Sequence, residues 1–311
     1  MVIWDSRLDN LELKISNKYN NIINNRNNLR YDENLLTGCL TIIDSFIYNS
    51  EITSSNSLCE DSVNFVRTKG WVKKINITNA IQDAVDVDFS NIIFEKMIVK
   101  NAGNDCLDLS AGNYKIIEAI LKNCKDKAIS VGERSFVSLD KADISKSKFG
   151  IVGKDSSFIF LNEINISSKK RCVSSLKKKN EYGGGNVNYV NLNCQKSINK
   201  KDQFSKLNKI DIGEFCKYVK EIYSGNICIT QNNIKLFSNN NRFIFAESIQ
   251  IVLNKKLASK KTQIFNLKNC DLRLINNCEI FSFDKNFLDI KTIDIKFFID
   301  KKIINEINLA I

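Results

Sequence analysis

From Asp61 onward the chain repeats itself every 22 residues, without insertion or deletion. The second position of each repeat is small and the third is aliphatic. The six repeats read DSVNFV (61–66), DAVDVD (83–88), DCLDLS (105–110), KAISVG (127–132), FGIVGK (149–154) and RCVSSL (171–176). A fixed period with a fixed side-chain size at each phase is typical of a solenoid, because each coil contacts only its neighbours and must match them.

The residues between the repeats favour β-strands. Runs such as IFEKMIV (93–99) and SFIFL (157–161) are rich in β-branched and aromatic residues and alternate in polarity. Three short strands with tight turns take about 22 residues, and stacked coils then pair in parallel about 4.8 Å apart. A second column, also at steps of 22, holds Asn79, Asn101, Asn123, Ser145 and Ser167. Stacked amides hydrogen-bond along such a ladder, so the sequence predicts an all-β solenoid.

The inward positions of the strand before this ladder shift by one residue partway along the repeat. The inward pairs are Ile75/Ile77, Met97/Val99, Ala119/Leu121, Ala142/Ile144 and Ile164/Ile166. A one-residue slip exchanges the buried and exposed faces. We therefore expect a bulge or a changed turn near residues 141 and 163.

Outside the repeats the chain is less regular. GCLTIID (38–44) reads as an earlier, irregular coil, and EYGGG (181–185) reads as a loop that breaks a later one. Residues 211–224 have apolar side chains at helical spacing. Strand-like runs follow without the 22-residue register, so either the solenoid degenerates or a second β-rich unit follows. The predicted division is irregular N-terminal coils or a cap (1–56), the regular solenoid (57–194), a basic linker with a short helix (195–224) and a C-terminal β-rich extension (225–311).

The ten cysteines include no CxxC pair, and the chain has no histidine. Cys106 and Cys172 occupy the second, small position of the repeat, which we call the small-residue column. Cys124 comes directly after Asn123 of the Asn ladder. We therefore expect buried free thiols rather than a disulfide framework. Without histidine or CxxC, a zinc site is not expected.

The formal net charge is +11, and residues 167–210 hold eleven of the basic side chains. Lys177, Lys178 and Lys179 form the densest run, and they are candidates for binding a polyanion. The alternative is a solvated lysine-rich loop. Because no aromatic residues are interleaved with these lysines, base stacking is not expected, and neither is a specific nucleic-acid partner.

No apolar run is long enough to span a bilayer, and the first ten residues do not form a signal peptide. The abrupt start leads us to expect either the C-terminal piece of a longer chain with further domains or a wrongly assigned start. An extracellular or cell-surface location is expected if that longer chain is secreted.

Aspartates gather at two phases of the repeat. Asp83 and Asp105 follow Asp61 at one phase, whereas Asp86, Asp88 and Asp108 are expected to face solvent on the same strand surface. Coil stacking would place carboxylates of like phase about 5 Å apart, a separation that suits retaining glycoside hydrolysis. Carboxylate oxygens also suit Ca²⁺, so Asp86, Asp88 and Asp108 are candidates for binding a glycan ligand or Ca²⁺. The alternative is turn chemistry, since Asp is frequent where turns lead into strands.

The 22-residue coil, the Asn ladder and the D-x-φ-x-φ strand starts (φ, an aliphatic or aromatic residue) resemble right-handed parallel β-helix proteins of the pectin-lyase-like group. The likeness covers about residues 61–194 well and 10–60 loosely. IQD (81–83) and GNDC (103–106) look like the two Asp motifs of polygalacturonase-type hydrolases, which implies catalytic roles for Asp83 and Asp105. The chain departs from that pattern at Asn104, where the family has a second Asp. It departs again at residues 126–128, where the family has Gly-His-Gly, and it has no downstream Arg-x-Lys.

Two functional hypotheses follow. The first is a non-catalytic β-helix module, extracellular or surface-attached, that binds polysaccharide or another glycan or has a structural or adhesive role. The second is an enzyme acting on acidic polysaccharide, either a lyase or a glycoside hydrolase. The missing histidine and the Asn104 substitution favour the first.

Overall fold

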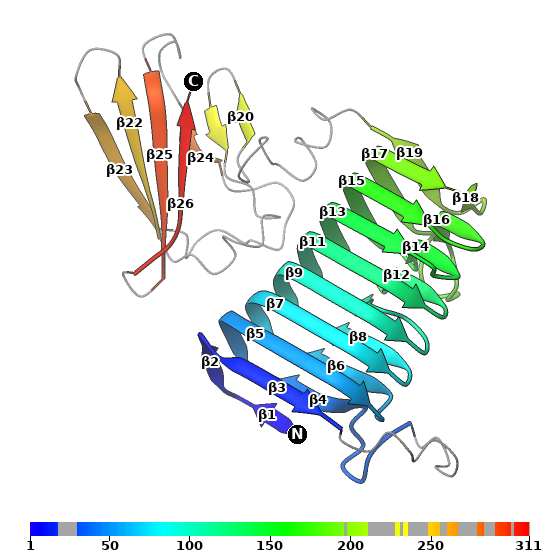
Figure 1. Ribbon diagram of the computed structural model, residues 1–311. Helices are drawn as coiled ribbons and strands as arrows, with labels where there is room; N and C mark the ends of the chain where they lie inside the picture. Colours follow the sequence, from blue (N-terminus) through cyan, green and yellow to red (C-terminus); the bar gives the residue numbers. More distant parts are fainter. Residues whose placement is uncertain are drawn as a thin grey trace. The chain divides into compact units, whose positions relative to one another are not determined.

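The computed structural model describes residues 1–17, 30–195 and 198–210, together with the strands of residues 228–230, 233–235, 248–255, 260–266, 279–282, 290–299 and 302–310. The chain forms two compact units, Met1–Ile210 and Asp211–Ile311. The first unit is a parallel β-solenoid of about eight coils, as predicted (Figure 1). The finer division at residues 56, 194 and 224 stays a prediction.

The solenoid contains two parallel sheets, and each coil adds one strand to each. Sheet A is formed, in spatial order, by β1 (Val2–Trp4), β4 (Gly38–Ile43), β6 (Asp61–Val66), β8 (Asp83–Asp88), β10 (Asp108–Ser110), β12 (Lys127–Gly132), β14 (Phe149–Lys154), β16 (Arg171–Leu176) and β18 (Ile198–Lys201). Sheet B is formed by β2 (Arg7–Asp9), β3 (Glu12–Ser16), β5 (Phe46–Ser57), β7 (Lys69–Ala80), β9 (Asn91–Ala102), β11 (Asn113–Cys124), β13 (Phe136–Ser145), β15 (Phe158–Ser167), β17 (Asn186–Gln195) and β19 (Lys206–Lys209). Figure 1 shows the strands of both sheets stacked in chain order.

The long strands of sheet B account for two of the three short strands expected in each coil. In β9, Phe94 pairs with Val72 and Lys96 with Lys74, but Glu95 has no partner in the register of the described strands. The inward side changes there, so that Ile92 and Phe94 point inward before it and Met97 and Val99 after it. Each long strand therefore carries two segments joined without a turn.

The small-residue column lies where backbone passes close by. A Cβ on Gly150 would stand 2.2 Å from the main-chain oxygen of Cys172 in the next coil. Ala84, Cys106, Ala128 and Cys172 are fully buried at the equivalent positions. The third, aliphatic position of each repeat is also buried, which confirms the inward column of Val63, Val85, Leu107, Ile129, Ile151 and Val173.

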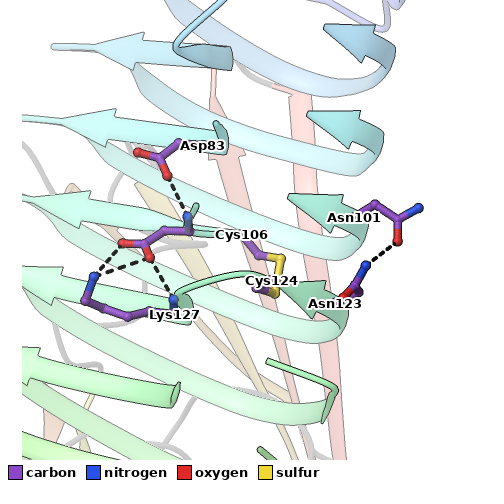
Figure 2. The surroundings of a disulfide bond; sticks show 7 residues. Asp83, Asn101, Cys106, Asn123, Cys124 and Lys127 are labelled. Atoms are coloured by element: carbon purple, nitrogen blue, oxygen red, sulfur yellow. Dashed lines mark hydrogen bonds and ion pairs between the residues drawn. A yellow bond between two sulfur atoms is a disulfide. The ribbon is translucent and has the colours of Figure 1, made fainter. Parts of the chain in front are cut away.

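The Asn ladder is confirmed in part. Asn101 donates an amide hydrogen bond to Asn79 (2.8 Å), and Asn123 donates one to Asn101 (2.9 Å; Figure 2). Asn56 extends the ladder by one coil toward the N-terminus, because the Asn79 amide donates a hydrogen bond to it at 2.9 Å. All four residues have left-handed backbone angles, a conformation that asparagine tolerates better than most residues.

The continuation of the ladder to Ser145 and Ser167 was wrong. Ser145 pairs with Lys122, so Lys146, with φ of 59°, takes the place that follows Asn123. The cause is one extra residue in the turn before β13. Asn113 pairs with Phe136, an offset of 23, whereas Asp108 pairs with Ser130, an offset of 22. The expected irregularity is therefore a changed turn, but it lies at residues 133–135 rather than near 141.

The expectation of free thiols was wrong for the six cysteines of the first unit. They form three disulfides: Cys39–Cys59, Cys106–Cys124 and Cys172–Cys194. The Cα atoms of the three pairs are 5.3, 5.4 and 5.8 Å apart. The sequence separations of 20, 18 and 22 residues are each close to one coil, so stacking brings both members of each pair to the same corner.

The described strands of the second unit are antiparallel, which favours a separate β-rich unit over a degenerate solenoid. One sheet contains β20 (Cys228–Thr230), β21 (Asn233–Lys235) and β24 (Glu279–Ser282). The other contains β23 (Lys260–Asn266), β22 (Ser248–Lys255), β25 (Ile290–Ile299) and β26 (Lys302–Ala310). The helix predicted at 211–224 lies outside the described residues, as do two of the strand-like runs, RFIFA (242–246) and DLRL (271–274).

Candidate functional site

The aspartates predicted from the sequence gather on three neighbouring coils of sheet A. Asp61 pairs with Asp83 across β6 and β8, and Asp86 pairs with Asp108 across β8 and β10. Asp105 lies in the turn that leads into β10, at the same phase as Asp83. The parallel register therefore brings together both groups of carboxylates.

The Asp83 and Asp105 side chains bind main-chain amides of the next coil. The Asp105 N–H donates to Asp83 Oδ1 at 2.6 Å, and the Lys127 N–H donates to Asp105 Oδ1 at 2.8 Å (Figure 2). Each carboxylate thus satisfies a backbone donor at a place where two coils meet. The functional roles of both residues stay predictions.

Lys127 ends the acidic column. Its Nζ lies 3.1 Å from Asp105 Oδ2 and 2.6 Å from Asp126 Oδ2. Lys148 Nζ also forms an ion pair with Asp126 Oδ1 at 3.0 Å. Although burial opposes it, the charges of Asp105 and Asp126 raise the pKa of Lys127. Lys127 is therefore a cation near neutral pH and not a proton acceptor.

Burial raises the pKa of most of these carboxyl groups. It raises the pKa of Asp83 to about 7, with the charge of Asp105 adding to the effect. It likewise raises the pKa of Asp61 to about 7 and that of Asp88 to about 6. For Asp105, burial raises the pKa and Lys127 partly opposes the change. Asp61 and Asp83 therefore titrate close to neutral pH.

Asp86, Asp88 and Asp108 point outward from sheet A but are only partly exposed. Burial, followed by the charge of Asp88, raises the pKa of Asp86 well above its usual value. Asn64 donates to Asp86 Oδ2 at 3.1 Å, and Lys154 Nζ lies 3.9 Å from Asp108 Oδ1. Within the part of the chain that the structure describes, no three carboxylate, cysteine or histidine side chains are placed to hold a metal ion. The Ca²⁺ hypothesis stays a prediction.

The predicted polyanion-binding lysines lie in a loop that carboxylates of other coils hold in place. The Lys178 and Lys179 amides both donate to Asp155 Oδ1 at 2.7 Å. Lys179 Nζ forms an ion pair with Glu133 Oε1 at 2.5 Å, and Lys177 Nζ lies 5.2 Å from the centre of the Phe204 ring. The structure thus brings the three lysines together, with the ammonium of Lys179 neutralised.

Two acidic residues of this region were missed by the sequence analysis. Asp155 is fully buried, and Glu133 also accepts a hydrogen bond from Ser110. Both follow strands of sheet A at the turn into sheet B, Glu133 one residue after β12 and Asp155 one residue after β14. An acidic residue at this same point of two successive coils was the available signal.

Comparisons with protein-family models, with curated proteins and with solved structures each found no match. Among the described residues we find no helix with the length and apolar character needed to cross a bilayer. The fold therefore rests on the chain's own repeat and geometry.

Proposed function

We propose that the solenoid is a non-catalytic module that binds polysaccharide, in an extracellular or cell-surface setting. The observation that carries this proposal is the set of contacts that the Asp83 and Asp105 side chains make. Each carboxylate accepts a main-chain hydrogen bond from the next coil, and Asp105 is also paired with Lys127. Carboxyl groups whose oxygens are already occupied in this way are poorly placed to exchange protons with a substrate.

Polysaccharide is the proposed ligand because the outward face of sheet A repeats polar groups in register. Across β6, β8, β10 and β12 this row holds Asn64, Asp86, Asp108 and Ser130, of which Asp86 and Asp108 are partly exposed and Asn64 and Ser130 are buried. Neighbouring strands lie about 4.8 Å apart, so a linear polymer along the axis would meet Asp86 and Asp108 on two successive coils. The partial pectin-lyase-like resemblance points to the same class of ligand.

The three disulfides support the proposed setting. Disulfides persist in secreted and surface proteins and are rare where thiols are kept reduced. Three of them within the first 210 residues favour maturation in an oxidising compartment.

The alternative function is an enzyme acting on acidic polysaccharide. The observation that favours it is the pKa of about 7 for Asp83 and of about 6 for Asp88, because a carboxyl group protonated near neutral pH can act as a general acid. Against it stand Asn104, which cannot exchange a proton as a carboxyl group does, and the positive charge of Lys127.

Two assays on the same purified chain separate these functions. We expect binding to at least one polysaccharide from a panel of neutral and acidic polymers, with no release of new reducing ends or unsaturated products. Product formation that Asp105→Asn abolishes, while the exposed control Asp143→Asn preserves it, would establish the enzyme instead. Failure to bind any polymer in the panel would refute the binding module.

A further inference from the structure

The turn that leads into each sheet A strand reverses its charge along the solenoid. Before β6, β8 and β10 this turn carries Glu60 with Asp61, Gln82 with Asp83, and Asn104 with Asp105. Before and at the start of β12, β14 and β16 it is mainly basic, with Asp126 as its one acidic residue and Lys127 paired with Asp105 and Asp126. We call the remaining basic side chains the cationic corner: Lys125, Lys146, Lys148, Lys169, Lys170 and Arg171.

Most of the cationic corner has no acidic partner. Lys148 is paired with Asp126. Within the described part of the chain, the other five side chains have no carboxylate within ion-pair distance. Lys125, Lys146, Lys169 and Lys170 are also exposed to solvent. Like charges on adjacent coils repel one another, so an anion with several charges would be attracted to this corner.

Phe149 lies at the centre of the cationic corner and orders its side chains. It pairs with Lys127 on one side and with Arg171 on the other, in the column that holds Asp83 in an earlier coil. Lys148 Nζ lies 5.2 Å from the centre of the Phe149 ring, and the Arg171 guanidinium carbon lies 5.7 Å from it. These cation–π contacts hold two of the cations against one partly exposed ring.

The backbone of the cationic corner is fixed before any ligand binds. The Lys169 and Lys170 amides donate to the carbonyl oxygens of Ser147 and Lys148, at 2.8 and 2.9 Å. Ser168 Oγ donates to the Arg171 carbonyl at 2.7 Å. The Cys172–Cys194 disulfide follows directly after Arg171. Only side-chain freedom is lost on binding, and this preorganisation favours affinity.

We propose that the cationic corner binds a linear anionic polysaccharide, carboxylated or sulfated, that lies along the solenoid axis across β12, β14 and β16. This inference rests on the proposed function and adds the class of ligand and its place. Coils about 4.8 Å apart present cations at regular steps, which suits a polymer with a charge on each repeating unit. A nucleic acid is disfavoured because a single aromatic ring gives no stacking platform for successive bases, and because the disulfides indicate an oxidising compartment.

The test compares three triple variants that each remove three positive charges. The corner variant is Lys146→Gln, Lys169→Gln and Lys170→Gln. The loop variant is Lys177→Gln, Lys178→Gln and Lys179→Gln. The control is Lys69→Gln, Lys100→Gln and Lys122→Gln, which are exposed positions on sheet B. Thermal melts confirm that all three variants fold, as expected for exposed substitutions.

Binding to heparin and to polygalacturonate is then measured over a range of salt concentrations. We expect the wild type to bind at least one of them with an affinity that falls steeply with salt. At about 0.1 M salt the corner variant should bind about tenfold more weakly and with a flatter salt dependence, whereas the control should stay within about twofold.

Every outcome of this test decides the proposal. Equal losses in the corner variant and the control would overturn the cationic corner, as would a loss confined to the loop variant, while the proposed function would stand. Binding to neutral polysaccharides alone would also overturn the cationic corner and leave the proposed function standing. Tighter binding to single-stranded DNA than to heparin at equal salt would replace the glycan with a nucleic acid. No binding to any polysaccharide would refute both proposals.

Discussion

At the scale of single residues, the same amino acid has different roles in neighbouring coils. Asp83 is largely surrounded by other carboxylates and accepts a main-chain hydrogen bond, whereas Asp126 lies between two lysines. Burial raises the pKa of Asp83 to about 7. Burial alone would also raise the pKa of Asp126, but Lys127 and Lys148 together lower it. The two residues should therefore give opposite pH dependences of stability.

We expect Asp83→Asn to stabilise the fold at pH 8 and to have little effect near pH 4. A carboxyl group whose pKa is raised on folding contributes stability below its unfolded pKa of about 4, and this contribution is lost as the pH rises through about 7. The asparagine keeps an oxygen for the Asp105 amide but cannot ionise. Thermal melts at both pH values measure the difference.

Asp126→Asn serves as the opposite case. The pKa of Asp126 is lowered on folding, so its ionised carboxylate stabilises the fold above about pH 4, and this contribution is lost in acid. The variant should therefore melt at a lower temperature than the wild type at pH 8. Destabilisation of equal size by Asp83→Asn at pH 4 and pH 8 would contradict the account of Asp83.

The sequence predicted the positions of these aspartates but not their roles. A fixed phase of 22 residues was enough to place Asp83 beside Asp105. The same pattern suited a catalytic pair, a cation site and turn chemistry, because sequence does not tell which groups a side chain contacts. The structure adds one such contact, the hydrogen bond of 2.6 Å from the Asp105 amide to Asp83 Oδ1.

At the scale of the strand, side-chain size decides which positions tolerate change. Ala128 and Gly150 belong to the small-residue column: Ala128 is fully buried, and a Cβ on Gly150 would stand 2.2 Å from a main-chain oxygen of the next coil. Lys122, on the outer side of β11, is exposed. The small-residue column and the outer face of a strand should therefore respond very differently to the same substitution.

We expect Ala128→Phe to destabilise the solenoid by about 1–3 kcal/mol or more, because overpacking forces the coils apart. Lys122→Phe should be nearly neutral and serves as the matched control. Urea unfolding followed by circular dichroism measures both. Equal stability of the two variants would show that the small-residue column is not sterically closed.

The strand register was only partly predictable. The inward column of Met97, Ala119, Ala142 and Ile164 was predicted and is buried in full. The place of the extra residue was not predicted. The shifted pattern of buried residues becomes visible only in the strand that follows the turn with the extra residue. The turn at 133–135 contains Glu133 and Arg134 with left-handed backbone angles, and neither residue type signals such a turn.

At the scale of the whole molecule, the disulfides were the main feature that the sequence analysis missed. We judged the cysteines by the absence of CxxC, which is a criterion for metal and redox sites. In a solenoid, residues about one coil apart become neighbours, and the three pairs are 18, 20 and 22 residues apart. The period that predicted the fold also contained the information that pairs the cysteines.

We expect the double variant Cys106→Ala and Cys124→Ala to lose about 3 kcal/mol of unfolding free energy, as loop closure predicts for a ring of this length. Alanine isolates the covalent link, because Ala84, Ala128 and Ala102 fill the equivalent positions of neighbouring coils. Urea unfolding gives the free energy, and alkylation with mass analysis verifies the bonds in the wild type. Free thiols in the native protein, or unchanged stability, would contradict the pairing.

The same three bonds set how the solenoid would behave under mechanical load. Pulling along its axis loads the hydrogen bonds between coils in series, so the coils should peel away one at a time. Each freed 22-residue coil would lengthen the chain by about 75 Å at full extension. Each disulfide closes a ring of about one coil, and that ring cannot be drawn out. A surface-anchored solenoid of this design would therefore yield in steps between its covalent rings and stop short of its full contour length.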